Sequence, residues 1–230
     1  MKRWDRMSKD FTRIGKEIVM AVKEGGASPD SNARLRTAMQ NAKGVNMPKD
    51  RVEAAIKRAT GKDEKDYSEV VYEGYGPHGV AIVVETATDN PTRTVSNVRL
   101  YFNRNNGALG TAGSSDYTFT RKGVFKLAAE GLDRDELELI DAGAEDVYET
   151  QEEDEHGAEH RYIVVETAFT DFGQMQQALA AKGVNVLSAT LQRVPNTTVS
   201  LNDEQAEEVE KLIDKLEEDE DVQAVYHTMG

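Results

Sequence analysis

The first sixty residues repeat apolar positions with the period of an α-helix. At about 100° per residue, the apolar residues of segment 2–24 fall on one stripe, spaced four, three, four and four apart. The pattern predicts a helix over residues 2–24 that ends at Gly25 and Gly26. The stripe consists of Met7, Phe11, Ile14, Ile18 and Val22.

Two shorter helices are predicted next. After a turn at residues 28–30, a second helix runs from Ser31 or Asn32, either of which can cap it, to Lys43. Pro48 suits the first turn of a third helix, which Gly61 closes. The expected core residues are Leu35, Met39 and Ala42 in the second helix, and Val52, Ala55, Ile56 and Ala59 in the third.

From Tyr67 onward, strands alternate with helices. The segment Val83–Asp89 recurs 81 residues later as Val164–Asp171 with one residue inserted. Both copies lead into a helix that ends at a glycine before another strand, Gly107 in the first copy and Gly183 in the second. The repeated unit is therefore strand, polar cap, helix, glycine, strand.

Four such units fit the sequence, and four units predict two split βαβ domains of the ferredoxin-like type. Sequence order does not say which halves pair. The acidic stretch Glu145–Glu159 is expected to be a solvated hairpin loop. The first copy contains a predicted strand at Val80–Glu85 and a helix from Thr92 to Asn105, apolar at Val95, Val98, Leu100 and Phe102. The unit before the second copy has strands at Val124–Leu127 and Val147–Tyr148 around a helix at Arg134–Ile140. The last unit has strands at Thr197–Leu201 and Val222–Tyr226 around a helix from Asp203 to Glu218.

The charge of the chain divides near the same boundary. The net charge is −14, but residues 1–66 have 16 Lys and Arg against 10 acids, whereas residues 67–230 have 12 against 32. A basic head (residues 1–66, net +6) thus precedes an acidic body (residues 67–230, net −20). This asymmetry indicates an anionic partner for the head, and phosphate backbones are the commonest such partner.

The cations of the head lie away from the predicted core, which leaves two interpretations open: a solvated helix face, or a phosphate-binding surface. Three such helices in an acidic protein favour the second. No aromatic stripe accompanies them, so base stacking is not indicated. The predicted nucleic-acid-binding residues are Lys2, Arg3, Arg6, Lys9, Arg13, Lys16, Lys23, Arg34, Arg36, Lys43, Lys49, Arg51 and Arg58.

Composition excludes several classes of protein. The chain has no cysteine, which removes disulfides, thiolate nucleophiles and Cys-ligated metal sites and suits a reducing cytoplasm, the expected location. The longest apolar runs, Ile18–Val22 and Val80–Val84, are far below the roughly 20 residues of a bilayer span, so no membrane partner is expected. The residues after Lys2 and Arg3 do not form the apolar core of a signal peptide.

Two motifs resemble known sites only superficially. Residues 74–79 match G-x-G-x-x-G, but a strand follows where a dinucleotide site needs a helix, so we expect a glycine turn between two strands. His156 and His160 stand four apart among acids, but Gly157 and the polar surroundings favour a loop. No metal and no other cofactor is therefore expected.

A polar cluster marks the junction between the first repeat strand and its helix. Asp89, Asn90, Arg93 and Thr94 are either a helix N-cap with Pro91 in the first turn, or a docking surface at the strand ends. Both interpretations remain open. No arrangement of serine, histidine and carboxylate presents itself, so an enzyme is not expected.

Several strings, taken in order, resemble the YebC/PmpR family over essentially the whole chain. They are Asn41-Ala42-Lys43 with Asn46-Met47-Pro48-Lys49, Tyr72 to Pro77, Thr88-Asp89-Asn90 with Arg93-Thr94, and Gly107 to Gly110 before Tyr117-Thr118-Phe119. The resemblance implies an α+β protein of three domains: a helical bundle followed by two ferredoxin-like α/β domains, one inserted in the other. The expected boundaries are 1–66 for the basic helical domain, 67–121 plus 196–230 for the second domain, and 122–195 for the inserted one.

The resemblance also implies a function. Family members are described as cytoplasmic transcriptional regulators that bind DNA, and the family is similar to a mitochondrial translational activator. The chain departs from the usual pattern at His78 and at Ser115-Asp116, and it starts at Met1-Lys2-Arg3-Trp4 without the short basic leader of many members.

Two functions follow from these observations. A DNA-binding transcriptional regulator is the first, with the head contacting phosphates. The alternative is a ribosome-associated translation factor, whose head contacts ribosomal RNA and whose acidic body faces basic ribosomal proteins. The net charge of −20 suits the alternative better, because a bare duplex would repel the body.

Overall fold

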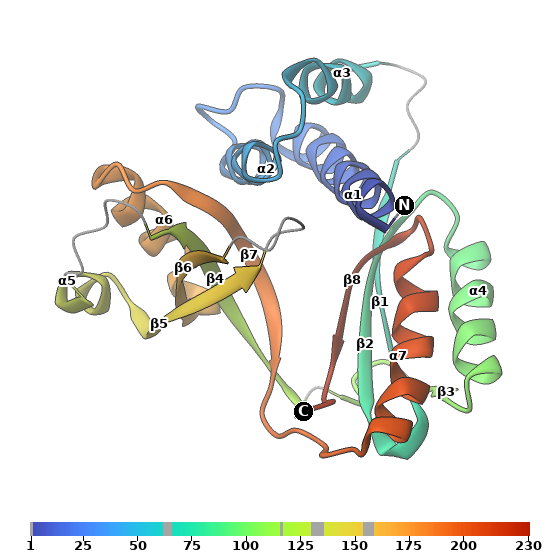
Figure 1. The fold of residues 1–230 in the computed structure, drawn as a ribbon. Helices are drawn as coiled ribbons and strands as arrows, with labels where there is room; N and C mark the ends of the chain where they lie inside the picture. The colour runs from blue at the N-terminus through green and yellow to red at the C-terminus, as the bar shows by residue number, and fades with distance from the viewer. Residues whose placement is uncertain (1, 62–65, 116, 130–135, 154–158) are drawn as a thin grey trace.

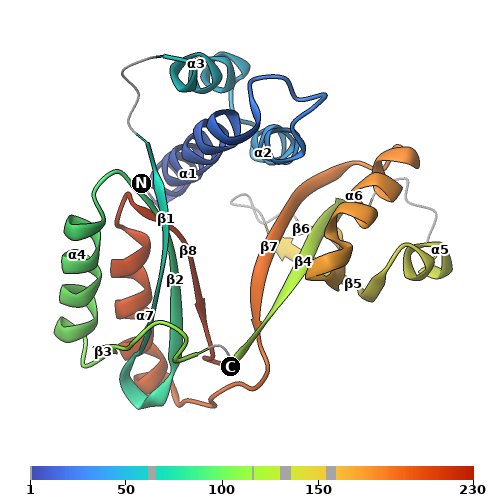
Figure 2. The same cartoon turned by 180° about the vertical axis from the view of Figure 1, so that it is seen from behind.

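The computed structural model describes residues 2–61, 66–115, 117–129, 136–153 and 159–230. Three parts are visible in Figure 1. Helices α1 to α3 lie at one end. Below them lie two separate sheets, whose long strands diverge from each other toward the helices. The view from behind in Figure 2 shows the same arrangement, with the C-terminus at the end where the two sheets approach each other.

The head folds as the predicted three-helix bundle. Its helices are α1 (Lys2–Gly25), α2 (Ala33–Gly44) and α3 (Lys49–Ala59). Asn32 caps α2 by accepting a hydrogen bond from the Leu35 N–H at 3.0 Å. The bundle core contains Ile18, Val19, Ala21, Val22, Leu35, Ala38, Ala42, Val52, Ala55 and Ala59.

The first sheet contains strands from both ends of the body. Its order is β3-β1-β2-β8 with antiparallel neighbours, and both α4 (Pro91–Arg104) and α7 (Asp203–Glu217) cover one face. Phe102 of α4 and Leu212 of α7 are fully buried in this core. The strands are β1 (Ser68–Tyr75), β2 (Ala81–Thr88), β3 (Ala108–Leu109) and β8 (Val222–His227).

The second sheet takes all its strands from residues 119–195. Its order is β5-β6-β4-β7, again with antiparallel neighbours. Helices α5 (Glu136–Asp141) and α6 (Phe172–Ala181) contribute to its core, in which Phe125 and Met175 are fully buried. The strands are β4 (Phe119–Ala128), β5 (Ala144–Glu153), β6 (Glu159–Ala168) and β7 (Val186–Pro195).

Both sheets have the strand arrangement of a ferredoxin-like fold, which confirms the α+β class. In the second sheet, the chain order β4-α5-β5-β6-α6-β7 is that of an uninterrupted ferredoxin-like domain. In the first sheet, β2, β3 and β8 occupy the positions that the first, second and fourth strands have in such a domain. The remaining central place is filled by β1, which precedes β2 in the chain.

Two predicted elements are wrong. The described part of the stretch Glu145–Glu159 is not a loop: β5 extends to Glu153 and pairs with β6, which begins at Glu159. Residues 154–158 lie outside the described residues. β5 is an edge strand, and Lys126 pairs with Glu152, so the acids tolerate strand geometry at the sheet edge. The predicted strand Thr197–Leu201 forms only an isolated bridge between Val199 and Met229.

The glycine turn at residues 74–79 is confirmed. β1 and β2 are joined by a short 3-10 turn, η1 (Pro77–Gly79), and His78 adopts φ 62° there. The helix needed for dinucleotide binding is absent at this point, because β2 follows directly. Of the apolar residues of α4, Val98 and Phe102 are fully buried, whereas Leu100 is 42% exposed.

Candidate nucleic-acid interface

Lys16 does not lie on a solvent-facing surface, contrary to the helical-wheel prediction. It is 8% exposed, and its ammonium group donates to the carbonyls of Ala87 at 3.0 Å and Glu220 at 2.7 Å. A third bond, of 3.0 Å, joins it to the Asp221 carboxylate. All three donors of Lys16 are thus used inside the protein, which leaves none for a phosphate.

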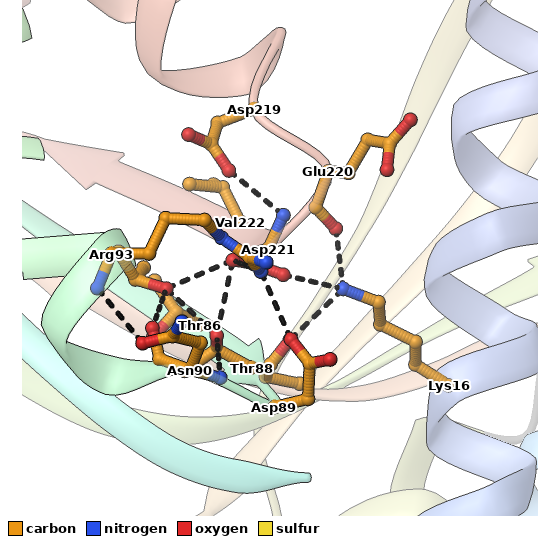
Figure 3. Close-up of polar contacts among 12 residues, drawn as sticks. Lys16, Thr86, Thr88, Asp89, Asn90, Arg93, Asp219, Glu220, Asp221 and Val222 are labelled. Carbon is orange, nitrogen blue, oxygen red and sulfur yellow. Dashed lines mark hydrogen bonds and ion pairs between the residues drawn. The ribbon is translucent and has the colours of Figure 1, made fainter. Parts of the chain in front are cut away.

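The centre of this arrangement is the buried carboxylate of Asp221. Figure 3 shows Lys16 and Arg93 approaching Asp221 from different helices. Oδ2 accepts from Arg93 at 2.6 Å, from Thr94 at 2.8 Å and from Thr88 at 3.0 Å. Burial alone would raise the pKa of Asp221, but the bonds from Arg93, Lys16 and Thr94 outweigh it and lower the pKa to about 2.

The polar cluster at the start of α4 forms a helix cap. Asn90 accepts from the Arg93 N–H at 3.1 Å, and Pro91 occupies the first turn, so the N-cap interpretation is confirmed. Thr94 is fully buried and faces Asp221. Arg93 also binds Asp89 at 3.0 Å. Docking at Asp89, Asn90, Arg93 and Thr94 stays a prediction, and Thr94 offers no exposed surface for it.

Other predicted cations are also bound within the protein. Arg13 donates to the carbonyls of Val222 and Glu217, which helps to fix α1 against the first sheet. Arg34 forms ion pairs with Glu17, Glu24 and Glu69, and these bonds, led by the one from Glu17, raise its pKa. Lys23 pairs with Asp66.

The remaining predicted cations include five exposed residues on α2 and α3. Lys49 has 89% of its side chain exposed, and Arg51 lies over the ring of Phe11 at 5.4 Å. Lys57, which is not among the predicted nucleic-acid-binding residues, is exposed on α3 as well. Lys9 is half-buried in α1, and the side chains of Lys2, Arg3 and Arg6 lie outside the described residues. The five are Arg36, Lys43, Lys49, Arg51 and Arg58.

No metal site is found among the described residues. His160 lies on β6, whereas His156 falls outside the part of the chain that the structure describes. Within that part, no group of three or more potential ligands gathers. None of its helices combines the length and apolarity that crossing a membrane requires.

The sequence match decides the family. The domain description "TACO1/YebC protein N-terminal domain" matches residues 1–62, and "TACO1/YebC second and third domain" matches residues 67–229. The chain belongs to the TACO1/YebC family. The match to YebC-type domains covers the head and both sheets, as the resemblance in the sequence implied.

Relatives of this TACO1/YebC chain carry a regulatory name. A protein of Cytophaga hutchinsonii, 57% identical over 231 residues, covering 100% of this chain and 93% of the relative, is named "Probable transcriptional regulatory protein". A relative from Flavobacterium psychrophilum, 53% identical with 100% and 94% coverage, has the same designation. A crystal structure of a conserved hypothetical protein from Aquifex aeolicus is similar, with a TM-score of 0.81, 36% identity, and 97% and 90% of the two chains covered.

Proposed function

We propose that this TACO1/YebC protein is a DNA-binding transcriptional regulator whose head contacts the phosphates of duplex DNA. The observation that carries the proposal is the division of charge, net +6 in the head against −20 in the body. The exposed cations of α2 and α3 extend this argument to particular residues, because their side chains reach solvent. The names of the relatives support the regulatory role.

The proposed contacts are to the DNA backbone. Phosphate contacts position a protein on a duplex, whereas base edges carry the sequence information. The charge division therefore supports affinity rather than a particular target sequence. The lack of cysteine suits the cytoplasm, which is the proposed location.

A salt titration of duplex affinity tests the head. Lys43 and Lys57 are exposed and form no ion pair with any described residue, so Lys43→Gln/Lys57→Gln leaves the fold in place. Each lost phosphate contact lowers the slope of log affinity against log salt by about 0.9, so a fall of about 1.8 is expected.

The matched control is Lys211→Gln/Lys215→Gln, which removes two exposed lysines from α7 in the acidic body. Its slope should equal that of the wild type. Equal slopes for the head variant and the control would reject the head as the binding surface. A wild-type chain with no salt-dependent affinity for duplex DNA would reject the function itself.

The alternative function is a ribosome-associated translation factor. The observation that favours it is the net charge of −20 in the body, which a bare duplex repels and basic ribosomal proteins attract. Sedimentation of a lysate through a sucrose gradient, with and without ribonuclease, separates the two. Migration with ribosomes that ribonuclease abolishes would favour the translation factor over the transcriptional regulator.

A further inference from the structure

Helix α4 is a basic element within the acidic body. Residues 67–230 contain 32 acids in 164 positions, yet none falls between Asp89 and Asp116. The same interval contains three of the twelve cations of the body, Arg93, Arg99 and Arg104, and all three lie in α4. Helix α4 therefore has a net charge of +3.

The outer side of α4 is polar and open to solvent. Its inner side packs Val98 and Phe102, both fully buried, into the core of the first sheet. Beyond the first turn, the exposed residues of α4 all lie on the other side, within about 140° of one another at about 100° per residue. We call them the α4 outer face: Ser96, Arg99, Leu100, Asn103 and Arg104.

The two arginines of the α4 outer face are not neutralised within the protein. Arg93 is engaged by Asp221 and Asp89, but Arg99 and Arg104 form no ion pair with any described residue. Asp219, which contacts α4, accepts hydrogen bonds from Asn97 and Tyr101, at 3.1 and 3.0 Å. The guanidinium groups of Arg99 and Arg104 are thus available to a ligand outside the chain.

We propose that the α4 outer face binds the phosphate backbone of the same duplex DNA that the head contacts; this rests on the proposed function. Arg99 and Arg104 are separated by about 7.5 Å along the helix axis, at 1.5 Å per residue. Five residues also turn the helix by about 140°, at about 100° per residue, so the two arginines lie at opposite edges of the α4 outer face and each engages a different phosphate of the duplex. Asn103 supplies a neutral donor of the kind that accompanies arginine at DNA backbones.

The position of α4 suits a shared ligand. In both views the start of α1 lies close to the end at which α4 begins, so a duplex on the head can extend toward the α4 outer face. The acidic side of α7 is the neighbouring surface and repels phosphate. At physiological salt this repulsion is screened over about 8 Å, whereas arginine contacts act at direct hydrogen-bond distance.

The test compares three variants of the full chain on one duplex of about 30 base pairs and arbitrary sequence. Arg99→Gln/Arg104→Gln should lower the slope of log affinity against log salt by about 1.8. Lys211→Gln/Lys215→Gln removes the same charge from adjacent α7 and should leave the slope unchanged. Lys43→Gln/Lys57→Gln reports on the head separately. Circular dichroism confirms that each variant keeps its helices.

The possible results distinguish failure of the α4 contact from failure of the proposed DNA-binding function. A lowered slope for the α4 variant and not for the α7 control supports the α4 outer face as a DNA contact. A slope equal to that of the control overturns this inference, and if the head variant still weakens binding, the proposed function stands. Absence of any wild-type duplex affinity overturns both. A structured RNA hairpin is titrated in parallel, and an effect of the α4 variant confined to that hairpin makes RNA the partner and overturns the DNA assignment.

Discussion

Asn41 of α2 pairs with the backbone of Ala189 in β7 through both ends of its side-chain amide. Nδ2 donates to the Ala189 carbonyl at 2.9 Å, and Oδ1 accepts from the Ala189 N–H at 2.8 Å. Because β7 is an edge strand, these two backbone groups have no neighbouring strand to pair with. The head thus provides hydrogen-bond partners for the N–H and the carbonyl of Ala189 at the edge of the second sheet.

Replacing Asn41 by alanine should loosen this contact. The change leaves both backbone groups of Ala189 without their partner, which costs about 1–3 kcal/mol of the free energy of unfolding. Hydrogen exchange at the Ala189 amide should accelerate, and urea denaturation should detect the lower stability. Gln40→Ala, which removes a side-chain amide with no hydrogen bond to a described residue, is the control. Unchanged exchange at Ala189 would contradict the role given to Asn41.

Two glycines of the head should respond oppositely to alanine. A Cβ at Gly44 would lie 1.7 Å from the Leu187 carbonyl oxygen of β7, so Gly44→Ala must push α2 away, at a cost of about 1–3 kcal/mol. A Cβ at Gly15, within α1, would meet nothing within 4 Å. Gly15→Ala should therefore stabilise the protein by about 0.5–1 kcal/mol. Thermal unfolding of the two variants checks both signs, and a stabilised Gly44→Ala would show that α2 does not pack this closely.

The ion pair between Lys16 and Asp221 should behave as a coupled unit. Lys16→Met leaves a buried carboxylate with one cation fewer, and Asp221→Asn leaves a buried ammonium group, so each should cost about 3–5 kcal/mol. The double variant should cost less than the sum, with a coupling energy of about 1–3 kcal/mol. Urea denaturation of the four proteins completes the cycle. Additive effects would mean that the two side chains act independently.

Stability should fall in acid, in part through Asp221. Its pKa in the folded protein is about 2, below the ordinary value of 3.8, so the unfolded chain binds the proton more readily. The stabilisation is complete above about pH 5 and is lost as the pH falls through about 2. Glu73 acts in the same direction: burial alone would raise its pKa, but bonds from Ser115 and the Gly113 N–H lower it.

The measurement is the free energy of unfolding at pH 7, 5 and 3. Asp221→Asn should be less stable than the wild type at pH 7 but should lose less stability on acidification. Asp214→Asn, which removes an exposed carboxylate of α7, serves as the control and should follow the wild-type profile. An acid dependence as steep in Asp221→Asn as in the wild type would contradict the assignment.

The sequence predicted the elements whose signals are local. The apolar stripe of α1, the Asn32 cap of α2 and the glycine that ends each repeat helix all act within a few residues of where they appear. The edge strand β5 has many acids and few apolar residues, so its sequence lacks the alternation of apolar and polar residues that predicts a strand. The predicted strand at Thr197–Leu201 failed for a different reason: β-forming residues were present, but only Val199 has a bridge partner.

The candidate site was harder to predict because its contacts cross the chain. Lys16 and Asp221 are 205 positions apart. A helical wheel of α1 compares only residues within that helix, so it cannot predict that Lys16 is buried against this carboxylate. The same holds for Asn41 and Ala189, 148 positions apart. The basic character of α4 could have been predicted, because no acid lies between Asp89 and Asp116. The net charge of −20 over residues 67–230 conceals this interval.

The place of β8 in the first sheet has a consequence for the order in which the protein assembles on the ribosome. The second sheet has all four of its strands once residue 195 has been synthesised, whereas the first sheet still lacks α7 and β8. Asp221 arrives in that same late segment, directly before β8. Since domains generally form as their residues emerge, the contact between Lys16 and Asp221 can form only after residues 119–195 have been synthesised. Completion of the polar contacts between α1 and the first sheet is thus a late step of synthesis.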